Sequence, residues 1–152
     1  MHRMVVIAAA AYAMWACGDG VDALAPADFV GVYSLRTVNG FPVPQEVGAA
    51  SGCTRSFEWG WLTLAESGFQ MSLTGRWGGC AGPGLNVIYG PQQSGGGVTI
   101  AEHTLVLHMV SAGNPGVTTV EATVSGSAIE LTLPPGSMNV AVTTTLGFTR
   151  DE

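Results

Sequence analysis

The chain of 152 residues contains no lysine, and it has only five arginines against eleven acidic residues. Nucleic-acid-binding proteins cluster Lys and Arg side chains on the phosphates, where they replace counterions. No such cluster occurs here, so the sequence excludes nucleic acid as a partner. It excludes a polybasic contact with anionic lipid headgroups for the same reason.

Motifs that carry catalysis or bind cofactors are also missing. There is no Gly-x-Ser-x-Gly elbow, no His-Glu-x-x-His zinc motif and no phosphate-binding Gly loop with its Lys. His103 and His108 are five residues apart on a predicted strand, so they point to opposite faces, which suits one metal ion poorly. We therefore expect no enzyme, no catalytic residue, no metal site and no cofactor.

Long apolar runs are absent beyond the N-terminus. There, His2 and Arg3 precede an uncharged stretch, Met4 to Trp15. This stretch is shorter than the roughly 20 residues that a membrane-spanning helix needs. A positive start followed by a short apolar core is typical of a secretion signal. We predict that residues 1–16 are a signal peptide and that the protein is exported.

Two cleavage sites compete in this signal. Ala11-Tyr12-Ala13 fits ordinary signal peptidase, whereas Met14-Trp15-Ala16-Cys17 resembles the bacterial lipobox, in which the cysteine is lipidated. We favour lipidation of Cys17, with residues 17–27 as a flexible tether to the cell envelope. The residue directly after Cys17 is Gly18 rather than Asp, which favours the outer membrane. The alternative is an ordinary periplasmic or secreted protein.

Three cysteines are an odd number for an exported protein. If Cys17 carries lipid, Cys53 and Cys80 remain as a pair, and an oxidising compartment favours their disulfide. Closing this loop of 27 residues would contribute about 3.5 kcal/mol to stability in the chain-entropy model.

The remaining chain, residues 28–152, has the length of one domain. Its apolar residues alternate with a period of two, which indicates strands rather than helices. Gly-rich and Pro-rich stretches, among them residues 78–84 and 90–97, are predicted to be the connections. The predicted strands are Phe29–Val38, Phe57–Ala65, Phe69–Trp77, Leu85–Tyr89, Val98–Glu102, Thr104–Ser111, Val117–Ser125, Ile129–Leu133 and Val140–Thr149.

Consecutive strands with short connections predict an all-β domain, an antiparallel up-and-down meander of about eight to ten strands. Closing the meander into a single barrel would remove its exposed edges. A β-sandwich is the second possibility.

The segment Gly31-Val32-Tyr33 resembles the first-strand motif of lipocalin-like barrels, and the following Val38-Asn39-Gly40-Phe41-Pro42-Val43-Pro44 is similar to a turn in small bacterial lipocalin-like lipoproteins. The resemblance implies that an Arg on the last strand, here Arg150, packs over the aromatic ring of Tyr33 and closes the barrel near Gly31. Such a stack would be a cation–π contact.

A binding wall is predicted from the register of the second predicted hairpin. A three-residue loop, Glu66-Ser67-Gly68, puts five aromatic side chains on one face, and an inward face would line a pocket for a small apolar ligand. A two-residue loop, Ser67-Gly68, would instead turn Trp59 and Trp61 outward toward a partner. The aromatic set is Phe57, Trp59, Trp61, Phe69 and Trp77.

Two functions therefore remain open from the sequence. One is a barrel that binds a small hydrophobic ligand in its interior. The other is an envelope module with a solidly packed barrel and no ligand, which acts through protein contacts. In both, the membrane is contacted through a lipid anchor only.

Overall fold

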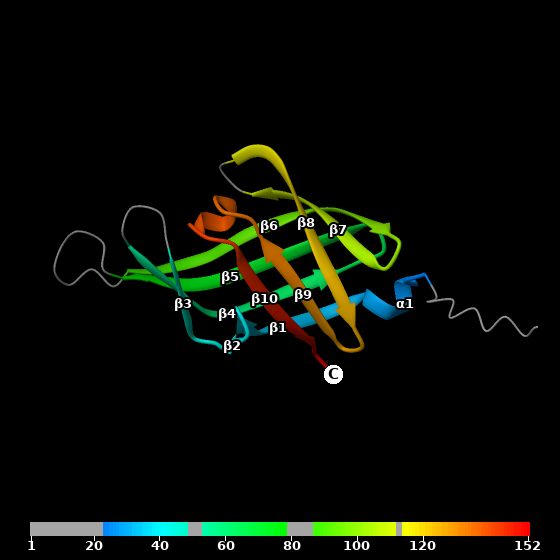
Figure 1. The fold of residues 1–152 in the computed structure, drawn as a ribbon, viewed down its shortest axis with the longest axis horizontal. Helices are drawn as coiled ribbons and strands as arrows, with labels where there is room; N and C mark the ends of the chain where they lie inside the picture. Colours follow the sequence, from blue (N-terminus) through cyan, green and yellow to red (C-terminus); the bar gives the residue numbers. More distant parts are fainter. Residues whose placement is uncertain (1–22, 49–52, 79–86, 112–113) are drawn as a thin grey trace, which may run out of the picture.

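The computed structural model describes residues 23–48, 53–78, 87–111 and 114–152. These residues form a closed barrel of antiparallel strands, in which each strand pairs with the next along the chain (Figure 1). β1 pairs with β10 on one side and with β4 on the other, which closes the barrel. The eight strands are β1 (Gly31–Val38), β4 (Thr54–Leu64), β5 (Gly68–Gly78), β6 (Val87–Ala101), β7 (Thr104–Ser111), β8 (Asn114–Ser125), β9 (Ala128–Leu133) and β10 (Thr144–Arg150). The predicted up-and-down barrel is confirmed.

Two short strands lie between β1 and β4, where the sequence predicted only a turn. β2 (Phe41–Pro42) pairs back onto β1 through a tight turn at Asn39-Gly40, both with positive φ. This is the backbone that an Asn-Gly hairpin adopts. β3 (Gln45–Gly48) pairs with the first residues of β4, whereas β1 pairs with its last residues. One strand, β4, thus has two partners on the same edge.

A short helical segment lies at each end of the barrel (Figure 1). α1 (Pro26–Phe29) buries Phe29 completely, and we call this the α1 end. η2 (Ser137–Asn139), a single 3-10 turn between β9 and β10, buries Met138 against the core, and we call this the η2 end. The interior between them is filled by inward side chains of all eight barrel strands, most of them 0–6 % exposed.

β6 differs most from the prediction. The predicted strands Leu85–Tyr89 and Val98–Glu102 are joined by β6 itself, so the predicted loop at residues 90–97 is wrong. The Gly-rich part of β6 pairs with β5 on one side and β7 on the other. A Cβ at Gly96 would overlap the carbonyl oxygen of His108, so glycine permits this close approach. Pairing on both edges overrides the weak strand propensity of glycine.

Other boundaries also moved. Phe29 belongs to α1 rather than to the first strand. Val140 follows η2, and β10 begins only at Thr144. The predicted tether, residues 17–27, lies mostly outside the described residues, and α1 begins at Pro26 near its end.

The hairpin between β4 and β5 has neither of the two predicted loops. Ala65 donates its N–H to the carbonyl of Gly68 at 2.8 Å, and Leu64 pairs with Phe69. The two loop residues are therefore Glu66 and Ser67. Both predicted registers are wrong by one or two residues.

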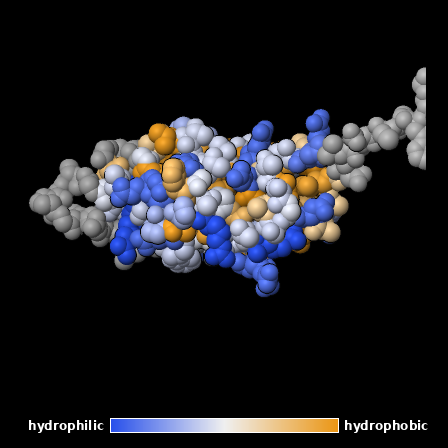
Figure 2. Space-filling model, turned by 60° about the horizontal axis from the view of Figure 1, so that its bottom comes forward, coloured by the Kyte–Doolittle hydropathy of each residue, from blue (hydrophilic) through white to orange (hydrophobic). Residues whose placement is uncertain are grey.

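No helix among the described residues is long and apolar enough to cross a membrane. In the view of Figure 2, apolar side chains occur on the outer surface as small groups between polar ones.

Candidate functional site

The predicted aromatic wall is divided between the two faces of the barrel. Phe57 and Phe69 are buried inside, whereas Trp59 is 52 % exposed and Trp61 is partly exposed. The cause is a β-bulge in β4: Phe57 pairs with Gly75 and Trp59 with Thr74, so Glu58 has no partner of its own. An extra residue reverses the inward and outward positions that follow it. The prediction of one aromatic face is therefore wrong.

Arg55 occupies the interior position next to Phe57. Before the bulge, the odd-numbered residues of β4 point inward, so Arg55 lies inside the barrel at the η2 end and is 2 % exposed. Its register partner on β5 is Trp77, which is partly buried. The guanidinium carbon lies 4.5 Å from the ring centroid of Phe57 and 5.8 Å from that of Trp77. Both distances are in the range of cation–π contacts.

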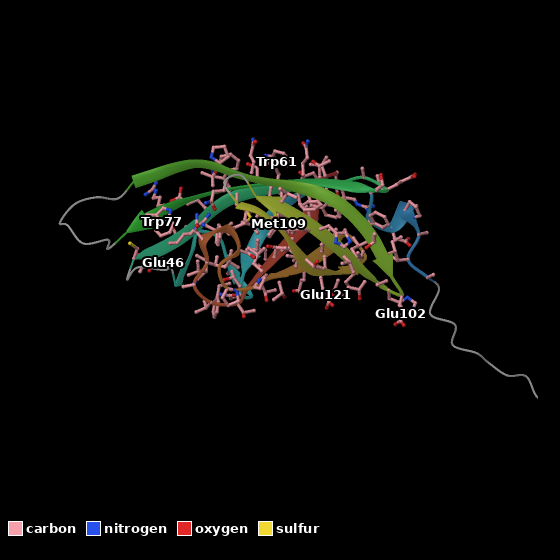
Figure 3. All side chains as sticks on the ribbon, turned by 90° about the horizontal axis from the view of Figure 1, so that it is seen from above. Glu46, Trp61, Trp77, Glu102, Met109 and Glu121 are labelled. Carbon is pink, nitrogen blue, oxygen red and sulfur yellow. The ribbon has the colours of Figure 1, made fainter. Side chains whose placement is uncertain are left out.

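The guanidinium donates to two neutral oxygens. Its Nη1 donates to the carbonyl of Met138 in η2, and its Nη2 donates to Oε1 of Gln92 on β6 at 2.5 Å. Arg55 thus connects three parts of the chain, β4, β6 and η2, at one point inside the barrel. Figure 3 labels Trp77, on the strand beside Arg55, and Met109, on β7.

No carboxylate among the described residues forms an ion pair with Arg55. The two ion pairs of the described chain join Arg36 to Asp151 and Arg76 to Glu58. Residues 49–52 and 79–86 contain no Asp or Glu. Burial lowers the pKa of the Arg55 guanidinium to about 10, so the group is still a cation at neutral pH. Among the described residues, Arg55 is therefore a buried charge whose two hydrogen-bond acceptors are both neutral.

A charge in this position opposes folding. Moving an ion out of water costs several kcal/mol even after relaxation, and neutral acceptors return only part of this. An apolar side chain of the same length would fill the space without that penalty. Arg55 is not among the site residues predicted from the sequence. Its spacing of two from Phe57 indicates that both share a face, but the bulge that turns this face inward depends on pairing with β5 and is not visible in the sequence.

The backbone of η2 is strained where Arg55 holds it. Met138 and Asn139 have φ values of 47° and 60°, and Gly136 precedes them at 87°. The left-handed region costs a side-chain-bearing residue about 1–2 kcal/mol. Ala141 ties the segment to β3 by donating its N–H to the carbonyl of Gly48 at 3.0 Å. Within the described part of the chain, the Arg55–Met138 and Ala141–Gly48 hydrogen bonds both join this segment to other strands.

The three methionines beyond residue 17 are all buried in the core. Met71 on β5 is 1 % exposed, Met109 on β7 is 2 % exposed and Met138 is 6 % exposed. Methionine is unbranched and polarizable, so it repacks around irregular shapes more readily than Leu or Ile. The interior thus contains three side chains that repack more readily than branched aliphatic ones.

The α1 end contains the three residues that the resemblance assigned to barrel closure. Arg150 pairs with Tyr33 in the β1–β10 register, and its guanidinium carbon lies 5.2 Å from the ring centroid. Arg150 also donates to the Tyr33 hydroxyl at 2.7 and 3.1 Å and to the carbonyl of Asp28 at 2.8 Å. The Tyr33 hydroxyl donates to the carbonyl of Phe29. A Cβ at Gly31 would lie 3.2 Å from Nε of Arg150.

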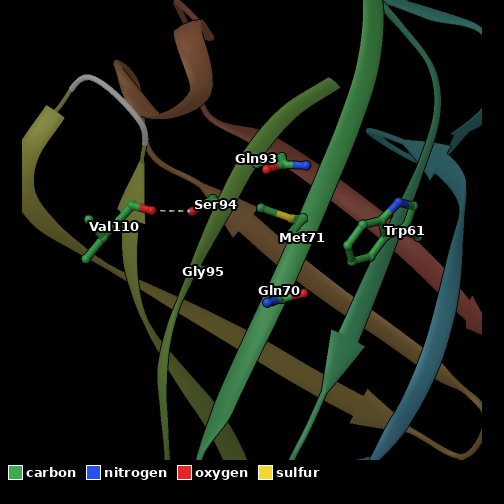
Figure 4. A pocket seen from close by; sticks show the side chains of 7 residues that line it. All are labelled: Trp61, Gln70, Met71, Gln93, Ser94, Gly95 and Val110. Atoms are coloured by element: carbon green, nitrogen blue, oxygen red, sulfur yellow. Dashed lines mark hydrogen bonds between the residues drawn. The ribbon is translucent and has the colours of Figure 1, made fainter. Parts of the chain in front are cut away.

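A hollow of about 320 Å³ lies on the outer surface over β4 to β7 (Figure 4). Trp61 and Val110 form its walls, and Gln70 and Gln93 carry amides beside it. Figure 3 labels Trp61 on this outer side of the barrel. Both polar and apolar side chains line the hollow. It is a surface feature, separate from the Arg55 site inside.

The predicted cysteines and histidines take no part in the sites described above. Cys17 and Cys80 lie outside the described residues, so lipidation and the pairing of Cys80 with Cys53 stay predictions. His108 contacts Thr99 through Nε2 at 3.1 Å, and His103 lies in the turn between β6 and β7. No group of three metal-ligating side chains occurs in the described part of the chain.

A scan against protein-family models, a search of known proteins and a search of solved structures each find no match for this chain.

Proposed function

We propose that this protein is a lipid-anchored, lipocalin-like barrel of the bacterial cell envelope that binds a small, largely apolar ligand inside its η2 end. The observation that carries the proposal is Arg55, a buried guanidinium that contacts two aromatic rings and has no carboxylate partner among the described residues. Packing alone gains nothing from a charge there. A polar group of a ligand that interacts with the guanidinium would explain why a charged residue occupies this position.

The adaptable interior and the strained segment over it support the same function. Met71, Met109 and Met138 can repack around a guest, and η2 covers the interior through few hydrogen bonds. Binding sites in barrels lie at such an end, where a short segment separates the interior from solvent. The first-strand motif at Gly31-Val32-Tyr33 and its contact with Arg150 support the lipocalin-like part of the proposal.

The test is ligand-dependent stability of the mature chain. A ligand that binds only the folded protein raises the free energy of unfolding by about 2.7 kcal/mol at a concentration one hundred times its Kd. We expect decanol, a neutral apolar probe, to raise the urea midpoint in a saturable way. Filling the interior by Met109→Trp should abolish this increase in a variant whose circular dichroism is unchanged. No increase with any medium-chain amphiphile contradicts the proposal.

The anchor is tested separately by the intact mass of the protein from its native membrane. A chain that starts at Cys17 and carries acyl groups supports the lipoprotein part of the proposal. A chain that starts at Met14 contradicts it, because cleavage after Ala13 removes no residue needed for the barrel but leaves Cys17 unlipidated. The same mass reports whether Cys53 and Cys80 lack two hydrogens, as a disulfide requires.

A second function is favoured by one observation, the outward-facing Trp59, which is 52 % exposed and lies two residues before Trp61 on β4. Large exposed aromatic side chains are enriched at protein interfaces. In this function the barrel is a module that binds a protein partner. In that function Trp59→Gln should abolish partner binding, and decanol should not stabilise the wild type or the variant. The ligand function predicts instead that decanol stabilises the wild type and Trp59→Gln equally.

A further inference from the structure

We propose that the hollow on the outer surface over β4 to β7 binds an uncharged N-acetylated sugar. The inference goes beyond the interior ligand site, because the hollow lies on the other side of the barrel wall. Its volume of about 320 Å³ is at the lower end of the range of small-molecule sites. A protein interface buries about 800 Å² on each partner, whereas this hollow has the size of one small molecule.

The hollow forms because small residues lie between large ones on the outward face of the sheet. Two rows of cross-strand partners lie next to each other there. They are Trp61, Ser72 and Gln93 in one row, and Gln70, Gly95 and Val110 in the other. The middle residues, Ser72 and Gly95, are small, and neighbouring strands are about 4.8 Å apart. The four larger side chains therefore surround open space.

Apolar surface borders the hollow at two opposite corners. Figure 4 shows Trp61 and Val110 on either side, with the two glutamines between them. The face of an indole ring is electron-rich, so it attracts the polarised C–H groups on the face of a sugar ring. Val110 is 47 % exposed, and its register partner Val117 is 64 % exposed. A methyl group of the ligand, such as that of an acetamido group, is buried against this second corner.

The polar part of the hollow consists of two side-chain amides. Neither Gln70 nor Gln93 forms a side-chain hydrogen bond to another described residue, and both are exposed. The other two glutamines of the chain are engaged, since Gln92 accepts from Arg55 and Gln45 donates to a backbone carbonyl. A primary amide has two donor hydrogens and one acceptor oxygen. It therefore pairs with sugar hydroxyls, which both donate and accept.

The charge of the surroundings restricts the ligand further. Among the described residues, no charged side chain lines the hollow. An ionised group would lose water there without gaining an opposite charge. This excludes a phosphate, a carboxylate or an amine as the group that is recognised. An N-acetylated sugar combines an apolar ring face, hydroxyl groups and an uncharged acetamido group.

The experiment compares N,N′-diacetylchitobiose with cellobiose, which have the same ring and linkage and differ in the acetamido group that replaces one hydroxyl of each ring. NMR spectra of the isotope-labelled mature protein report the side-chain amides of Gln70 and Gln93 and the indole N–H of Trp61. We expect both sugars to shift these three signals in a saturable way. Diacetylchitobiose should bind about fourfold more tightly, because it buries an additional methyl group.

Variants of the lining residues assign the contact. Trp61→Leu should weaken diacetylchitobiose binding about tenfold, because it removes the aromatic face. Gln93→Ala should weaken it about fivefold, because it removes hydrogen bonds to hydroxyls. Trp59→Gln and Gln45→Ala are the matched controls, since Trp59 and Gln45 have the same side-chain types but do not line the hollow; both variants should bind as the wild type does.

The outcomes separate this site from the interior site. Decanol should leave the three signals unchanged, so a failure of decanol to bind would overturn the interior site alone. If neither sugar shifts the signals, the sugar site is overturned. Equal affinity for the two sugars overturns the acetamido assignment.

Two further results would also overturn the assignment to the hollow. One is an equal loss of affinity in Trp59→Gln and Trp61→Leu, which would place the contact on the wider outer face of β4, as a protein partner would use it. The other is unchanged affinity in Gln93→Ala. This variant decides if Trp61→Leu does not fold, because Gln93 is exposed and its truncation leaves the core intact.

Discussion

Arg55 shows how one residue can hold a charge inside an apolar barrel. It is 2 % exposed, it contacts two aromatic rings, and its acceptors are a backbone carbonyl and an amide. The space around it depends on Gly75, which pairs with Phe57 across the hairpin. A Cβ at Gly75 would overlap the carbonyl oxygen of Ser56, so no other residue fits the close approach of β4 and β5.

Gly75→Ala is therefore expected to lower the free energy of unfolding by about 2 kcal/mol, the usual effect of overpacking. Urea unfolding measures this. The control is Gly48→Ala, because a Cβ there would meet only Val142, at an ordinary 3.9 Å; its stability should stay within about 0.5 kcal/mol of wild type. Equal stability of both variants would show that β4 and β5 are not this close at the bulge.

At the scale of elements, the bulge in β4 decides which side chains enter the barrel. Phe57 and Trp59 are two residues apart in one strand, a spacing that would put them on the same face. The unpaired Glu58 puts Phe57 inside and Trp59 outside, and its carboxylate meets Arg76 at 2.7 Å on the surface. The same bulge brings Arg55 into the interior.

This assignment predicts opposite effects for two neighbouring aromatic residues. Phe57→Ala should lower the free energy of unfolding by about 3–5 kcal/mol, because it leaves a cavity in the core. Trp59→Gln should change it by less than about 1 kcal/mol, because half of the side chain is already in water. Urea unfolding of each variant measures these two changes in the free energy of unfolding. If the two variants lowered the free energy of unfolding by similar amounts, Phe57 and Trp59 would share the inward face, and the bulge would be wrong.

For the whole molecule, closure joins β1 to β10 and β4, and the two barrel ends are built differently. At the α1 end, Arg150 is fastened by the Tyr33 hydroxyl and by the carbonyl of Asp28, and these bonds hold α1 against the barrel. At the η2 end, Arg55 is the corresponding guanidinium, but it holds a strained segment. The two guanidinium groups therefore differ in what they hold: Arg150 holds a helical segment, and Arg55 holds a turn with positive φ values.

The variant Arg150→Met tests the role of Arg150 at the α1 end. Loss of its hydrogen bonds to Tyr33 and Asp28 should lower the free energy of unfolding by about 1–3 kcal/mol and speed exchange of the Val30 amide, which donates to Pro26 at 2.8 Å. Exchange of the Ala141 amide at the other end should not change. Arg36→Met is the control, since its ion pair with Asp151 is 3.9 Å long and largely exposed; it should have almost no effect. Faster exchange at both ends would mean that the ends are coupled.

Much of the fold could be predicted, because alternation along a strand is a local property. The inward set Phe69, Met71 and Leu73 on β5 and the set Ile129, Leu131 and Leu133 on β9 follow from period two alone, and all are buried. Short connections between consecutive strands then leave an antiparallel meander, and exposed edges favour its closure.

The candidate site could not be predicted, because non-local pairing creates it. The tertiary structure placed Arg55 inside through a bulge that depends on the fit of Gly75 against Ser56 in the adjacent strand. It also made the Gly-rich stretch of β6 a strand, since two neighbours pair with it. Alternation within a strand belongs to the sequence by itself, whereas a bulge is a relation between two strands, and only the folded barrel brings those strands together.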